Sequence, residues 1–217
     1  MFWNVSINLL QGFSTNILIF LITLITSIPL GLLIAFCEKN NNIFIRKASR
    51  FYVWVIRGTP LMLQLLIVFY TPGLIFGIPL KQRLLVVIIT FTIHYSAFFA
   101  EIFKTGLESI PLGQYEAGIV LGLSKSKIFF HIILFQLIQL TIGPISNEVI
   151  GIVKNTSLAR ILAVQEMLMK SSVYTTNGII WPLFYTGVFF LIVTYLLTVF
   201  FRKLERRLDH VCGRESN

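Results

Sequence analysis

The chain has 217 residues, of which 56% are hydrophobic and only 12% are charged. Its mean hydropathy of +0.83 is too high for a water-exposed surface, so these proportions exclude a soluble globular domain and predict an all-α membrane protein. The net charge of +9 comes with no nucleic-acid-binding motif, and we expect no nucleic-acid partner.

Five apolar stretches of the sequence predict five transmembrane helices, since a helix needs about 20 mostly apolar residues to cross the bilayer core. They are Ile17–Phe36, Leu61–Ile78, Leu84–Phe103, Ile128–Val153 and Ile179–Phe201. No Lys or Arg precedes the first stretch, and its apolar run is too long for a signal peptide. We therefore expect it to remain in the mature protein.

The basic residues predict the orientation, because cytoplasmic loops of membrane proteins are enriched in Lys and Arg. Twelve of them follow the first, third and fifth stretches, against five in the other two loops. This pattern predicts an outside N-terminus and a cytoplasmic C-terminus. We expect one transmembrane domain over 1–217, with its core at 13–203 and a cytoplasmic tail at 204–217. An apolar stripe of Leu204, Leu208 and Val211 predicts that this tail forms an interfacial helix.

A polar loop separates the third and fourth predicted spans. Pro111 and Gly113 predict the end of one helix, and Gly122, followed by possible N-caps at Ser124 and Ser126, predicts the start of the next.

The space between these signals suits one short helix, roughly Gln114 to Leu121. Glu116 would lie in its first turn, where a negative charge suits the helix dipole. Ala117 and Gly118 would contribute to a small face of the kind that fits a partner's groove.

The spacing of this loop is similar to the EAA loop of membrane subunits of binding-protein-dependent ATP-driven importers. The positions that match are Glu116, Ala117, Gly122, Ile132 and Leu134. Gly118 stands where the pattern has a second Ala, and Phe135 replaces its Pro. The resemblance implies that the loop couples the chain to a separate ATPase, through Gly113, Gln114, Glu116, Ala117, Gly118 and Gly122.

Three further segments resemble the polar-amino-acid branch of that importer family: Arg57–Leu61 (RGTPL), Ser96–Ile102 (SAFFAEI) and Lys154–Leu158 (KNTSL). The resemblance implies the ABC type I importer permease fold in the bacterial inner membrane, and a small polar amino acid as solute. It also implies a second permease copy or homologue, ATPase subunits that bind the ATP, and an extracytoplasmic solute-binding protein.

Ionisable side chains within the spans are candidates for the translocation path, because they are costly in a bilayer. His94 is either a neutral imidazole bonded between helices or a solute contact. Glu148 is either an ammonium-binding carboxylate or a structural partner of Arg57, Lys154 or Asn147. It follows Pro144, which we expect to kink the fourth span and free a carbonyl. Lys154 and Ser157 of the last motif complete the candidate set. Arg57 is expected to anchor the second span at the cytoplasmic surface.

The sequence shows no motif for chemistry of its own. It lacks the nucleotide-binding G-x-x-x-x-G-K-[ST] pattern, the H-E-x-x-H metal pattern and the G-x-S-x-G nucleophile pattern, and its one Asp is Asp209. We expect no catalytic residue, metal or cofactor, and a transporter subunit rather than an enzyme. An ion-coupled secondary carrier or channel is the alternative, and a membrane enzyme is a weaker third.

Overall fold

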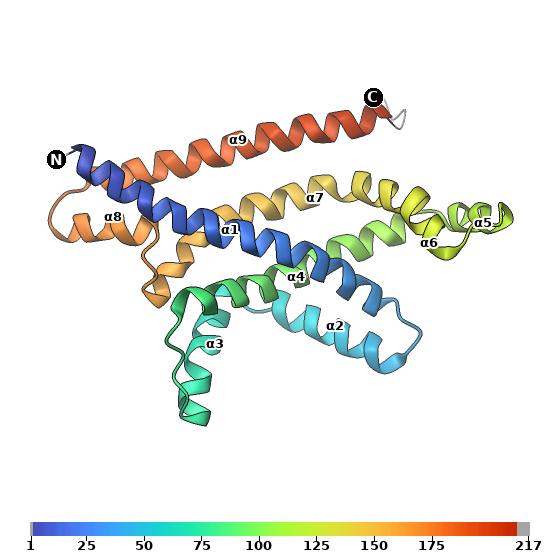
Figure 1. The fold of residues 1–217 in the computed structure, drawn as a ribbon, viewed down its shortest axis with the longest axis horizontal. Coiled ribbons are helices and arrows are strands. Elements are labelled where there is room, and N and C mark those ends of the chain that lie inside the picture. The colour runs from blue at the N-terminus through green and yellow to red at the C-terminus, as the bar shows by residue number, and fades with distance from the viewer. Residues whose placement is uncertain (1, 212–217) are drawn as a thin grey trace.

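A computed structural model describes residues 2–211, with the side chains of residues 2–208. All the elements in this range are helical (Figure 1). They are α1 (Phe2–Glu38), α2 (Ile43–Arg57), α3 (Leu61–Phe76), α4 (Arg83–Ser109), α5 (Leu112–Val120), α6 (Lys125–Ile128), the π-helical segment η1 (Phe129–Ile133), α7 (Leu134–Asn155), the 3₁₀ helix η2 (Thr156–Leu162), α8 (Met167–Thr176) and α9 (Trp181–Val211).

Four helical units of the described chain are long and apolar enough to cross a membrane. They are α1, α4, the stretch Lys125–Leu162 and α9 up to Leu208. A fifth span exists if α2 and α3 are counted together, although they meet at an angle of 108°. The predicted span at Leu61–Ile78 is present as α3, whose 16 residues are long enough for a span only together with α2. Pro60 causes the break, because a proline disfavours helix at the residue before it.

Hydropathy did not indicate α2, because its basic residues lower the mean hydropathy of the segment. Asn42 caps it by accepting a hydrogen bond from the backbone N–H of Phe44. Buried Val53 packs with Ala97 and Ala100 of α4. The Tyr52 hydroxyl also donates to a backbone oxygen of α4 at 2.7 Å. These contacts hold α2 alongside α4.

The core lies along α4, whose Phe91, Tyr95 and Phe99 are among the largest fully buried side chains. Glycines allow its two main neighbours to approach closely. A Cβ on Gly31 of α1 would come within 2.6 Å of the Phe99 Cβ, and one on Gly106 would come within 2.5 Å of a methyl group of Thr141 on α7. Close packing at small residues replaces the hydrophobic driving force that helices lack in lipid.

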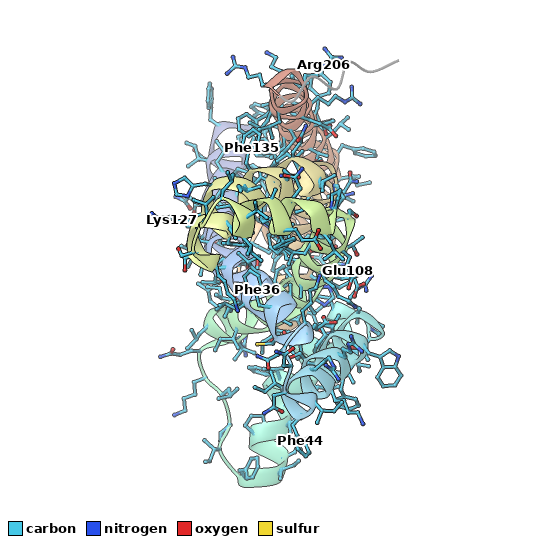
Figure 2. The ribbon with its side chains drawn as sticks, turned by 90° about the vertical axis from the view of Figure 1, so that its right-hand side faces the viewer. Phe36, Phe44, Glu108, Lys127, Phe135 and Arg206 are labelled. Carbon is cyan, nitrogen blue, oxygen red and sulfur yellow. The ribbon has the colours of Figure 1, made fainter. Side chains whose placement is uncertain are left out.

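The two ends of the molecule carry different elements (Figure 1). The N-terminal end of α1 and α8 lie at one end, while α5, α6 and the last turns of α9 lie toward the other. Figure 2 looks onto this second end, where the exposed charged side chains of Glu108, Lys127 and Arg206 lie around the edge. The N- and C-terminal ends thus lie at opposite ends of the bundle.

The tail was predicted to form a separate interfacial helix. It is helical, but it is part of α9, which continues without a break from Trp181 to Val211. Leu204 and Leu208 are partly buried on it. The side chain of Val211, the third member of the predicted stripe, lies outside the described residues. Within its described part, the tail is an extension of the last span.

Candidate functional site

A short helix is present in the polar loop, but it starts earlier than predicted. α5 begins at Leu112 because Pro111, with φ −59° and ψ 137°, is its N-cap. Gly113 and Gln114 therefore lie inside the helix, and Glu116 is not in its first turn. The predicted dipole interaction of Glu116 is wrong for this reason, since the dipole effect falls off within that turn.

Two glycines set the geometry of this loop. Gly122 has φ +70°, a left-handed backbone that glycine adopts without strain. Gly118 is buried, and a Cβ there would lie 2.6 Å from Cγ1 of Ile128 on α6. The glycine that replaces the usual Ala thus lets α5 rest directly on α6.

The outer side of this loop exposes apolar side chains without a partner in the described chain. The exposed fraction is 76% for Leu112, 86% for Val120 and 74% for Leu121. Glu116 and Ala117 are also exposed. An apolar surface at the tip of a projecting loop fits a docking role better than a packing role.

A polar cavity of about 290 Å³ lies between α4 and α7. Its lining residues are Arg57, Phe98, Glu101, Ile102, Thr105, Gly106, Ser109, Leu140, Thr141, Pro144 and Glu148. The Arg57 guanidinium donates to Glu101 at 3.1 Å and lies 5.6 Å from the centre of the Phe98 ring. Arg57 thus pairs with a carboxylate beside this cavity, and the expectation that it anchors a helix at the cytoplasmic surface stays a prediction.

The Arg57–Glu101 pair continues into a chain of charges that the sequence analysis missed. Lys104 lies 3.8 Å from Glu101 and 3.0 Å from Glu38 of α1. The Glu38 side chain is only 1% exposed. The signal available in the sequence was Glu38 directly after an apolar run, with a basic residue in the last turn of α2 and another within α4.

Glu148 lies on the α7 wall of the cavity. Among the described residues, no basic side chain forms an ion pair with it. α7 passes through Pro144 without ending, and Pro144 and Leu140, whose carbonyl loses its helical donor there, also line the cavity. The cavity therefore holds one arginine, which is paired with Glu101, and a second carboxylate without a counter-ion.

The other three path candidates lie elsewhere. His94 is 7% exposed, with its Nδ1 3.0 Å from Oε1 of Gln64 on α3. Lys154 and Ser157 line a separate cavity of about 270 Å³ against α8 and α9. The structure thus brings Glu148 together with Arg57 and Glu101 and not with the other predicted path residues.

Comparisons with known proteins agree with this architecture. Residues 27–210 match the family described as the inner membrane component of binding-protein-dependent transport systems. The chain is 32% identical over 217 residues to the L-cystine transport system permease protein TcyB of Bacillus subtilis, covering 98% of this chain and 90% of TcyB.

Two further proteins are similar over most of their length. The histidine/lysine/arginine/ornithine transport system permease protein HisM of Salmonella typhimurium is 31% identical over 221 residues, with 92% of each chain covered. A solved amino acid ABC transporter with histidines matches the fold with a TM-score of 0.85 at 21% identity, covering 95% of this chain and 96% of that one.

The matched family covers most of the chain, and the apolar helices, the projecting α5 and the glycine at Gly122 fit its membrane subunits. The relatives are transport permeases and not enzymes. The chain therefore belongs to the bacterial inner membrane components of binding-protein-dependent transport systems, with the fold of ABC importer permeases.

Proposed function

We propose that this chain is the permease subunit of an ATP-driven importer that carries a polar amino acid delivered by an extracytoplasmic solute-binding protein. The names of TcyB and HisM, which refer to cystine and to basic amino acids, support the solute class. A second permease copy or homologue would complete the pathway. ATP is bound by separate ATPase subunits, and this chain needs no cofactor.

The unpaired Glu148 beside the paired Arg57 carries the solute part of the proposal. Every amino acid has an α-ammonium group, which can offset the cost of a carboxylate without a counter-ion in an apolar span. The glycine-lined, partly open cavity leaves room for such a group. His94, Lys154 and Ser157 then act outside this contact, at other positions along the path or in holding the helices together.

The apolar surface of α5 carries the coupling part. A helix of this kind fits a hydrophobic groove of a partner, here the ATPase. Closure of the ATPase dimer would push on α5, and Ile128 beneath Gly118 would pass the movement to α6 and α7. The cavity would then open outward to receive solute from the binding protein.

Uptake by the reconstituted complex tests the proposal. The complex, with its binding protein and ATPase, is assayed with glutamine, cystine, histidine and lysine. We expect ATP-dependent uptake of at least one of them that survives collapse of proton and sodium gradients. Uptake driven by a gradient without ATP would instead identify a secondary carrier.

The variant Gly122→Val tests the coupling loop. A β-branched residue at φ +70° costs about 1–3 kcal/mol of strain, which should displace α5 and abolish ATP-dependent uptake or association with the ATPase. Gly77→Val is the matched control, because Gly77 has φ +67° and open space for a Cβ but lies at the end of α3, outside the coupling loop. Normal assembly and uptake in Gly122→Val would remove the coupling role.

A further inference from the structure

A second and larger cavity lies where α4 ends and α7 begins. Its volume is about 560 Å³, and its lining residues are Ser109, Ile110, Pro111, His131, Ile132, Phe135, Gln136, Gln139 and Leu140. Ser109 and Leu140 also line the Glu148 cavity. The two cavities therefore share a wall and form one trough along α4 and α7 toward the end that carries α5.

The two halves of this trough differ in chemistry. No carboxylate lines the larger cavity, and its polar side chains offer hydrogen-bond donors. The Nε2 group of Gln139 is buried and has no partner in the described chain. His131 holds its Nδ1 3.2 Å from the Lys127 carbonyl, so its other nitrogen remains available. A buried amide donor without a partner is costly, and a turn of the Gln139 side chain toward the cavity would let an acceptor there satisfy it.

We propose that the larger cavity is an exit station that binds the carboxylate of the departing solute, with Gln139 as its donor. This rests on the proposed import function. Gln139 and Glu148 are nine residues apart on one helix, which corresponds to about 13.5 Å along its axis. A small amino acid cannot span that distance, so the two sites hold it in succession, by its ammonium group at Glu148 and by its carboxylate at Gln139.

The exit station is joined directly to the coupling helix. Nε2 of Gln136, which lines the cavity, donates to Oε1 of Gln114 on α5 at 3.3 Å. The basic Lys125 and Lys127 lie one to two turns before this wall, and their charge favours an anion there. A solute carboxylate in the station therefore lies next to the contact between α5 and α7.

Thiol reagents of opposite charge can test this chemistry without knowledge of the solute. The complex with its ATPase is placed in nanodiscs of neutral lipid, with Cys37 and Cys212 replaced by Ser. One cysteine is then introduced, either Ile132→Cys in the larger cavity or Thr105→Cys in the Glu148 cavity. Rates with an anionic and a cationic methanethiosulfonate are each divided by the rate of the same reagent with a free thiol.

We expect Ile132→Cys to favour the anionic reagent and Thr105→Cys the cationic one. Adding Gln139→Leu to Ile132→Cys should lower the anionic preference by about fivefold, the effect of one hydrogen bond, whereas Ile138→Leu, which changes a neighbour outside both cavities, should not. Acetate should slow modification of Ile132→Cys, and ethylammonium should not.

Equal charge preference at the two cysteines, or no effect of Gln139→Leu, would overturn the inference while uptake by the unaltered complex still supports import. An effect of phosphatidylglycerol in the nanodisc with none of acetate would overturn it in favour of a lipid headgroup site. If the unaltered complex shows no amino-acid uptake, the import function fails, and a retained anion preference would still support the carboxylate site.

Discussion

Two carboxylates line the same cavity in opposite electrostatic conditions. Glu101 on α4 has two cations within 4 Å, Arg57 at 3.1 Å and Lys104 at 3.8 Å, while Glu148 on α7 has no ion-pair partner among the described residues. The difference separates a charge that holds helices together from a charge without an ion pair, which we propose contacts the solute. A prediction from burial and charge alone would have given Glu101 and Glu148 the same role.

Lys104 accounts for much of the difference between Glu101 and Glu148, because its ammonium group pairs with both Glu101 and the buried Glu38. The chain of charges joins α1, α2 and α4 on one side of the cavity. α7 contributes no basic side chain to it. One wall of the cavity is therefore fixed by ion pairs, and the α7 wall has none among the described residues.

The largest expected effect comes from removing the charge of Lys104, which forms two of the ion pairs on this side of the cavity. Lys104→Met would leave the Glu38 carboxylate, 1% exposed, without a cation, at a cost of about 3–5 kcal/mol. We expect a clear fall in the melting temperature of the purified protein. Glu38→Gln in the same chain should restore most of it, and Lys127→Met at an exposed site should have little effect. Unchanged melting in Lys104→Met would contradict the structural role of the ion chain.

A change at Glu148, the carboxylate without an ion pair, should alter solute uptake and leave the stability of the protein unchanged. Glu148→Gln should weaken apparent uptake affinity by about 1.5–3 kcal/mol and leave melting unchanged, since no ion pair is lost. Glu101→Gln should do the reverse and lower the melting temperature. Paired measurements of melting and uptake on both variants check this. A fall in stability in Glu148→Gln with unaltered uptake would make Glu148 a structural residue.

A smaller effect is expected from Phe98, whose ring lies under Arg57. Removing the ring in Phe98→Leu costs about 0.5–1 kcal/mol of cation–π attraction, which lets Arg57 move toward Glu148 and compete with solute. Apparent uptake affinity should then fall by about twofold to fivefold. Phe98→Tyr keeps the ring and should behave like the unaltered chain. Equal affinities in all three proteins would show that Arg57 does not compete.

The smallest effect concerns Glu166, a fully buried carboxylate outside the spans that is held by hydrogen bonds instead of a cation. It accepts from the backbone N–H of Leu168 at 2.8 Å and of Met169 at 2.6 Å, and from Nδ2 of Asn16 at 3.2 Å. Burial raises the pKa of Glu166 above its usual value despite these bonds. The protonated form is thus favoured in the folded protein relative to the unfolded one.

The stability contributed by this group is present below the usual glutamate pKa of about 4.3 and is lost as the pH rises through the raised pKa. Melting temperatures of the unaltered chain and of Glu166→Gln, measured across this window, give the contribution as a difference. We expect the advantage of the unaltered chain to shrink as the pH rises. A difference that stays constant across the window would rule out a raised pKa.

Sequence reasoning predicted the membrane class and the short helix in the polar loop. These features depend on local properties: apolar runs of bilayer length, proline and glycine signals, and motif spacing. The same reasoning did not find α2, because the spans were read from hydropathy and the basic residues of α2 lower the hydropathy of its segment.

The sequence by itself determined that this chain lies in a membrane as a bundle of helices, because the cost of exposing unpaired backbone groups to lipid leaves few other solutions. Only the tertiary structure decided which charges neutralise one another. Arg57, Glu101, Lys104 and Glu38 come from three helices, and their pairing depends on how closely α1 and α4 approach at Gly31. The same packing left Glu148 without an ion pair to any described residue, since ion pairs are set by distances of a few ångströms that no spacing along one helix encodes.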